Sequence, residues 1–108
     1  MKSQQFLQKP KKPNRHERRF LVRRVCGDSM YPALEAGQLV FALHTKQISR
    51  GDVVVFRHEG IEKIKRVVGM EGDFVYVLGD NPRFSTDSRQ FGYIKQSTIA
   101  GRVVWPKV

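Results

Sequence analysis

Gly27-Asp28-Ser29-Met30-Tyr31-Pro32 places one serine between a glycine and a proline, at the mouth of the first expected strand. Gly27 can adopt backbone conformations closed to other residues, while Pro32 fixes its own φ and disfavours helix at Tyr31. A turn of this kind holds a serine hydroxyl in the open, where a nucleophile must be. Serine, glycine, aspartate and proline are also ordinary turn formers, so the stretch alone leaves a surface turn and a nucleophile as alternatives.

Outward from this turn, short apolar runs alternate with glycine-containing turns at roughly ten-residue spacing, which predicts an all-β sandwich or small barrel. The expected strands are Phe20–Val22 with Val25–Cys26, Gln38–Leu43, Val53–Phe56, Ile61–Gly69, Phe74–Leu78 and Arg102–Trp105. No long segment shows helical periodicity. A long polar loop over 79–92 interrupts the pattern, and because its side chains can pair with one another we expect it to be functional.

The formal charge of +10 lies mostly in the N-terminal segment. Residues 1–24 hold nine of the 20 Lys and Arg residues and one acidic residue, whereas residues 25–108 hold eleven basic and nine acidic residues. The first 19 residues contain few apolar side chains, so we expect a disordered basic leader over 1–19 and a folded domain over 20–108. The leader can contact an anionic lipid surface, a nucleic acid or an acidic partner, and a solvated tail is the expectation.

Several functional classes are disfavoured by composition. No apolar run approaches the roughly 18 residues of a membrane helix, and the N-terminus lacks the apolar segment of a secretory signal. The single cysteine, Cys26, excludes an internal disulfide, fits a reducing compartment and is expected to be buried. The histidines have no metal-ligand spacing, so no metal or cofactor is expected. These features predict a cytoplasmic protein.

Two further segments carry groups that suit catalysis. Lys65 lies in a run where strand alternation places Lys63 and Lys65 on one face, although neither face is cleanly apolar. A buried lysine has a lowered pKa, and its neutral amine can accept a proton from a serine hydroxyl. In the loop 79–92, Asp87 and Arg89 can form a charge-assisted pair, and Ser85 is a hydroxyl able to orient an amine.

Three blocks together resemble the signal peptidase I type (S26) of serine–lysine endopeptidases. The blocks are Gly27–Leu34, Lys65–Gly69 followed by Gly72-Asp73, and Gly79-Asp80-Asn81 followed by Ser85, Asp87-Ser88-Arg89 and Phe91-Gly92. Arg50–Phe56 matches a further structural block, and the blocks stand in the family's order over roughly 25–105. Any one block would be a weak signal, whereas their joint appearance is a strong one.

The resemblance implies a partly open β-barrel and a role for each matching residue. Ser29 would be the nucleophile and Lys65 the general base, while the Ser29 backbone N–H would face the developing oxyanion. Ser85 matches the hydroxyl that holds the lysine amine, and the ion pair of Asp87 and Arg89 matches one that supports the site.

The chain departs from the family at two points. Many signal peptidases carry a serine oxyanion donor two positions before the nucleophile, and Gly27 stands at that position here. The membrane anchor expected of a general secretory signal peptidase is also missing. The sequence therefore looks most similar to the small soluble proteases that remove the N-terminal extension of nickel-type superoxide dismutase precursor, which makes such a precursor the expected partner. Mitochondrial inner-membrane peptidases and signal peptidases that process exported precursors are the alternative.

Two other classes of protein fit the sequence less well. LexA-type self-cleaving repressors share a serine–lysine pair, but residues 1–24 are too short for a helix-turn-helix. A nucleic-acid-binding β-barrel would use the basic leader and exposed aromatic rings. Because the aromatic residues lie in apolar runs, we expect them to pack in the core, and no nucleic-acid partner is expected. These residues are Phe41, Phe56, Phe74, Tyr76 and Trp105.

Overall fold

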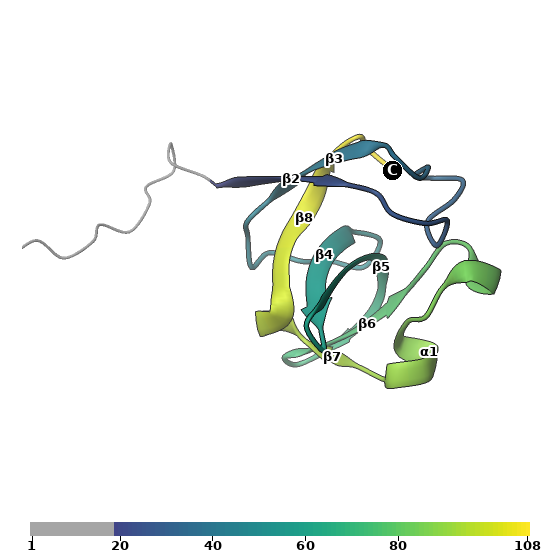
Figure 1. The fold of residues 1–108 in the computed structure, drawn as a ribbon. Helices are drawn as coiled ribbons and strands as arrows, with labels where there is room; N and C mark the ends of the chain where they lie inside the picture. Colours follow the sequence, from purple (N-terminus) through teal and green to yellow (C-terminus); the bar gives the residue numbers. More distant parts are fainter. Residues whose placement is uncertain (1–18) are drawn as a thin grey trace, which may run out of the picture.

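Seven antiparallel strands form one curled sheet over residues 19–108, which are the residues that the computed structural model describes (Figure 1). The strands are β2 (Phe20–Arg24), β3 (Leu39–Leu43), β4 (Val53–His58), β5 (Ile61–Glu71), β6 (Phe74–Leu78), β7 (Ile94–Lys95) and β8 (Ile99–Trp105). Their order in the sheet is β2-β3-β8-β4-β5-β6-β7. The first and last strands of this order, β2 and β7, do not pair with each other, so the sheet is open. The predicted all-β, partly open architecture is confirmed.

The core fills the inside of the curl, and its residues come from the apolar runs of the sequence. Strand β4 is the most buried strand, because its first four residues, Val53–Phe56, are all buried. One apolar cluster surrounds Phe56. A second one packs around Met30, which lies within the serine turn Gly27–Pro32, and around Leu34, which follows it. The serine turn is therefore anchored by its own apolar residues.

The loop 79–92 contains more regular structure than the sequence predicted. It holds a 3-10 turn, η1 (Pro82–Phe84), and a one-turn helix, α1 (Ser88–Phe91), followed by the two-residue strand β7. A second 3-10 turn, η2 (Gln96–Thr98), leads into β8, which begins three residues earlier than expected. The basic leader predicted over 1–19 lies outside the described residues except for Arg19.

The expectation of buried aromatic residues is correct for Phe56, which is fully buried, and holds only in part for Tyr76, which is half-buried. It is wrong for the exposed residues Phe41, Phe74 and Trp105. The last three project from the outer face of the sheet or from its far edge, because strand alternation turns every second side chain away from the core. No helix within residues 19–108 is long and apolar enough to cross a membrane.

We predict that Phe56→Ala lowers the free energy of unfolding by about 3–5 kcal/mol, because it leaves a cavity at a fully buried position. The matched control is Phe74→Ala, which removes a side chain that is 46% exposed and should cost about 1 kcal/mol or less. Urea unfolding followed by circular dichroism measures both values. Equal losses in the two variants would contradict the assignment of the core.

Candidate active site

Ser29 sits at the start of a turn that both neighbouring segments hold in place. On its C-terminal side, the Leu34 N–H donates to the Met30 carbonyl at 2.9 Å, and the side chains of Met30 and Leu34 are both buried. In front of it, the Asn81 N–H donates to the Ser29 carbonyl at 2.8 Å, and Asn81 Nδ2 donates to the Asp28 carbonyl at 3.0 Å. The serine hydroxyl is thus presented from a fixed backbone.

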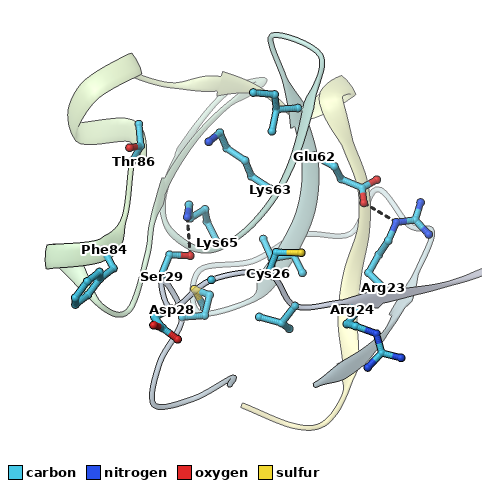
Figure 2. Close-up of a pocket in the computed structure, with 15 residues that line it drawn as sticks. Arg23, Arg24, Cys26, Asp28, Ser29, Glu62, Lys63, Lys65, Phe84 and Thr86 are labelled. Atoms are coloured by element: carbon cyan, nitrogen blue, oxygen red, sulfur yellow. Dashed lines mark hydrogen bonds and ion pairs between the residues drawn. The ribbon is translucent and has the colours of Figure 1, made fainter. Parts of the chain in front are cut away.

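Lys65 faces inward from the middle of β5, which settles the orientation that periodicity left open. It lies opposite Val54 of β4, a fully buried residue, and its own side chain is 5% exposed. Its amine donates a hydrogen bond of 2.8 Å to Ser29 Oγ, so the two residues predicted as nucleophile and base are in direct contact (Figure 2). Burial, followed by the positive charge of Lys63, lowers the pKa of Lys65 to about 8, while Asp87 opposes the shift.

The contact between Ser29 and Lys65 lies in a groove of about 500 Å³. One wall is the segment from Arg23 to Met30, and the other is the first half of β5, from Ile61 to Lys65. Figure 2 shows Phe84 and Thr86 closing one end of this groove. Strand β6 pairs with β5 from Arg66 onward, so the groove half of β5 has β4 on one side and no strand partner on the other within residues 19–108. An extended peptide can add to such an edge.

Asp87 is the buried centre of the loop 79–92. Its carboxylate accepts hydrogen bonds from Arg89 Nε at 2.9 Å, from Arg89 Nη2 at 2.7 Å and from the Gly79 N–H at 2.9 Å. It also caps α1 by accepting from the Arg89 N–H, while Gln90 accepts from the Asp87 N–H. Burial by itself would raise the pKa of the Asp87 carboxyl, but the bonds from Arg89, Ser85 and the backbone outweigh burial and hold that pKa well below its usual range. The predicted pair of Asp87 and Arg89 is present.

Ser85 is brought to the same carboxylate, where its Oγ donates to Asp87 at 2.6 Å. Within the described residues it forms no hydrogen bond with Lys65. A Cβ added to Gly79 would collide with the Ser85 side chain and would lie 2.7 Å from the Ser29 carbonyl oxygen. Gly79 therefore allows the loop and the serine turn to approach each other at a distance that no other residue permits.

Sequence reasoning missed one ion pair that locks β5 to this loop. Arg66 donates to both carboxylate oxygens of Asp80, at 2.9 Å and 2.8 Å, and to the Gly51 carbonyl at 2.9 Å. Both residues stood in the quoted blocks, so the signal was present, but their spacing in the sequence does not show that they meet. Cys26, expected to be buried, is exposed and lines the groove instead.

A buried lysine amine bonded to a serine hydroxyl, in a groove on an all-β sheet, defines a candidate serine–lysine peptidase site. Comparison with known families agrees: the family described as Peptidase S24-like matches residues 2–104. The chain belongs to this family and, by its relatives, to the signal-peptidase type within it. The predicted class of serine endopeptidase is confirmed at the level of the family.

The relatives are membrane proteases and signal peptidases by name. Mitochondrial inner membrane protease subunit 1 from Mus musculus is 34% identical over 74% of this chain and 66% of its own length. The Schizosaccharomyces pombe protein of the same name is 34% identical over 84% of this chain and 77% of its own length. Signal peptidase I S from Bacillus subtilis is 38% identical over 52% of this chain and 33% of its own length. The chain thus spans about two thirds of the mouse relative.

These relatives overturn one expectation. The cytoplasmic location predicted from composition is wrong, because the relatives are named as proteases of the mitochondrial inner membrane, which points to an association with a membrane. The prediction of a cytoplasmic location rested on the lack of an apolar run. A sequence without such a run can still belong to a protein that attaches to the surface of a membrane.

We predict that Asp87→Asn lowers the free energy of unfolding at pH 7 by about 2–3 kcal/mol, because hydrogen bonds to a buried charge are lost. The folded-state pKa of Asp87 is depressed, so its stabilising effect is present above the unfolded pKa of roughly 4 and is lost as the pH falls below that value. Urea unfolding of both proteins from pH 7 to pH 3 should therefore show the difference shrinking.

The matched control is Glu62→Gln, which breaks a partly exposed pair with Arg23 and should cost less than about 1 kcal/mol. A difference between wild type and Asp87→Asn that stays constant down to pH 3 would contradict the ionised state of Asp87.

Proposed function

We propose that the chain is an endopeptidase that cuts N-terminal extensions from precursor proteins, with Ser29 as nucleophile and Lys65 as general base. One observation carries the proposal: a lysine amine that is 5% exposed donates a 2.8 Å hydrogen bond to a serine hydroxyl in an open groove. A surface lysine would stay protonated at neutral pH, whereas the pKa of Lys65 is lowered to about 8 by burial and the charge of Lys63. A useful fraction of the amine is then neutral near physiological pH.

The reaction follows from these two groups. Neutral Lys65 accepts the Ser29 proton as Oγ attacks the scissile carbonyl, and the resulting ammonium protonates the leaving amine when the peptide C–N bond breaks. Lys65 is neutral again after this step. It then accepts a proton from water as that water attacks the acyl-enzyme carbonyl, and the resulting ammonium returns a proton to Ser29 Oγ when the ester bond breaks. The product acid leaves, and both Ser29 and neutral Lys65 are regenerated.

The Ser29 backbone N–H is our candidate for the first oxyanion donor. Within the described residues it donates to no protein acceptor, so it is free to bind a developing negative charge. Gly27 has no side chain that can serve as a second donor, and its φ of +77° lies in the region that favours glycine. A second donor must therefore be a backbone group or water.

We assign supporting roles to Ser85, Asp87 and Arg89. Because the Ser85 hydroxyl donates its hydrogen bond to Asp87, its lone pairs remain available to accept a hydrogen bond from the Lys65 amine when that amine turns during catalysis. Arg89 neutralises Asp87, which limits how far the carboxylate raises the pKa of Lys65. The ion pair of Asp87 and Arg89 thus holds the loop 79–92 next to Lys65 without fully stabilising the protonated form of the Lys65 amine.

The names of the relatives favour precursors delivered at a membrane as substrates. Processing of exported or membrane-delivered precursors is therefore our main proposal. Removal of the extension of nickel-type superoxide dismutase precursor is the narrower proposal from the sequence, and it has no support from those names.

We predict a single cut near the N-terminus when wild-type protein is incubated with a suitable precursor, and a rate at least about 10³-fold lower for Ser29→Ala. Intact-mass spectrometry measures the product, with one inner-membrane or exported precursor and one extended nickel superoxide dismutase precursor in parallel. Lys65→Arg should fail as well, because arginine stays protonated.

Each pattern of cleavage has a distinct meaning. Cleavage of the dismutase precursor alone would assign the narrower function. Cleavage of neither folded precursor would contradict both substrate proposals. A mass loss in the protease itself, absent in Ser29→Ala, would instead assign a self-cleaving reaction.

We also predict that kcat/KM falls about tenfold per pH unit below a pKa near 8, because the protonated amine cannot act as a base. In Lys63→Met this limb should move to higher pH, since the charge of Lys63 lowers the pKa of Lys65. Lys46→Met, in another pocket of the surface, is the matched control and should leave the profile unchanged. Activity that stays flat well into acid would exclude lysine as the base.

A further inference from the structure

One lysine of the groove makes no ion pair within residues 19–108. Lys63 lies on β5 two residues before Lys65, so strand alternation places both side chains on the same face. Figure 2 shows both amines pointing from β5 toward the segment that holds Thr86, and Lys63 and Thr86 both line the groove. None of the ion pairs in this part of the chain involves Lys63, which is half-buried. Lys63 therefore presents an uncompensated positive charge to the groove.

The acidic residues that line the groove and the smaller pocket beside it do not neutralise Lys63. Glu62 pairs with an arginine of β2 at 2.5 Å. Glu59, in the smaller pocket, lies 3.9 Å from a ring nitrogen of the neighbouring histidine. Figure 2 shows the Asp28 carboxylate pointing away from Lys63, beyond Ser29. The groove thus has a place for one more negative charge, and a substrate can supply it.

The opposite face of the groove is apolar. Val25 and Ile64 line it, and both pack in the cluster around Met30. A peptide strand that adds to the open edge of β5 turns alternate side chains to opposite faces. We call the residue whose carbonyl Ser29 attacks the scissile residue. If its side chain is small or apolar it fits the face of Val25 and Ile64, and the adjacent side chain of the peptide then points to Lys63.

The adjacent residue that reaches Lys63 belongs to the extension that is cut off, and this step rests on the proposed function. The open edge of β5 accepts an extended segment. The mature part of a precursor folds, whereas its extension is removed, so the extension is the part that can occupy the groove. The residue directly before the scissile residue then lies opposite Lys63.

We propose that Lys63 determines substrate specificity by binding the carboxylate of an Asp or Glu side chain at the residue directly before the scissile residue, with the Thr86 hydroxyl as a second donor. An ammonium bound to a carboxylate forms a charge-assisted hydrogen bond, whereas a neutral amide offers no charge and a lysine side chain is repelled. The charge of Lys63 also acts on Lys65, whose pKa it lowers. A carboxylate bound to Lys63 therefore lies next to the catalytic pair.

The test measures binding to the full chain carrying Ser29→Ala, so that neither proteolysis nor the strength of the base interferes. Three short fluorescein-labelled peptides span the site that the wild-type protein cuts in a precursor, and they carry Glu, Gln or Lys directly before the scissile residue. We expect fluorescence polarisation to give a Kd about fivefold lower for the Glu peptide than for the Gln peptide, the size of a partly exposed charge pair. The Lys peptide should bind more weakly than both, and high salt should reduce the differences.

Charge reversal makes the test specific to Lys63. Adding Lys63→Glu to Ser29→Ala should reverse the order, so that the Lys peptide binds most tightly, while circular dichroism checks that the fold is unchanged. Adding Thr86→Val should weaken the Glu peptide by about two- to threefold, because one hydrogen bond is lost. The matched control is Lys46→Glu, which makes the same change of charge at an exposed lysine in another pocket and should keep the preference for Glu.

Three outcomes would overturn the inference. Equal affinity for the three peptides, while the wild-type protein cuts the precursor, would leave the proposed function standing and restrict Lys63 to its effect on the pKa of Lys65. Loss of the preference in Lys46→Glu as well as in Lys63→Glu would assign it to the overall charge of the protein. Failure of the wild-type protein to cut any precursor would contradict the proposed function and, with it, this inference.

Discussion

The structure depends on keeping one lysine amine out of water next to a serine hydroxyl. Burial disfavours the charged amine, so Lys65 weakens the fold wherever it is protonated, and the surrounding apolar packing must offset that cost. An unshielded carboxylate beside it would remove the effect by stabilising the ammonium. Asp87 is close enough to raise the pKa of Lys65, and Arg89, bound to both of its oxygens, limits that influence. The site is therefore a balance of burial and charge.

The balance requires three separate segments to meet, and the loop 79–92 joins them. Asn81 donates to the carbonyls of Asp28 and Ser29 in the serine turn. Arg66 binds Asp80 to β5, the strand that carries Lys65. Gly79 lets the loop pass the serine turn without a steric clash. The sheet thus positions Lys65, and the serine turn positions Ser29. The loop 79–92 contacts both segments and fixes the distance between the two residues.

The sequence predicted the all-β fold and which residue types would meet, because ordered motif blocks carry that information. It could not predict which face of β5 is buried, since apolar and charged residues alternate without a clean pattern and Val54 on the neighbouring strand decides the matter. Helix α1 is too short for periodicity, although Asp87 and Gln90 have the spacing of a capping box. The sequence also failed to predict that Phe41 and Trp105 are exposed, because apolar runs at the edge of a sheet resemble apolar runs in its core.

That last error has a physical meaning. A sheet that ends at β2 leaves one face of β2, β3 and β8 without a packing layer, and a soluble domain would usually place polar residues there. This chain places the exposed apolar side chains of Val22, Phe41 and Trp105 on that face. The same short strand leads into the segment from Arg23 to Met30 that forms one wall of the groove, so the outer face of the sheet and the groove are joined through one strand.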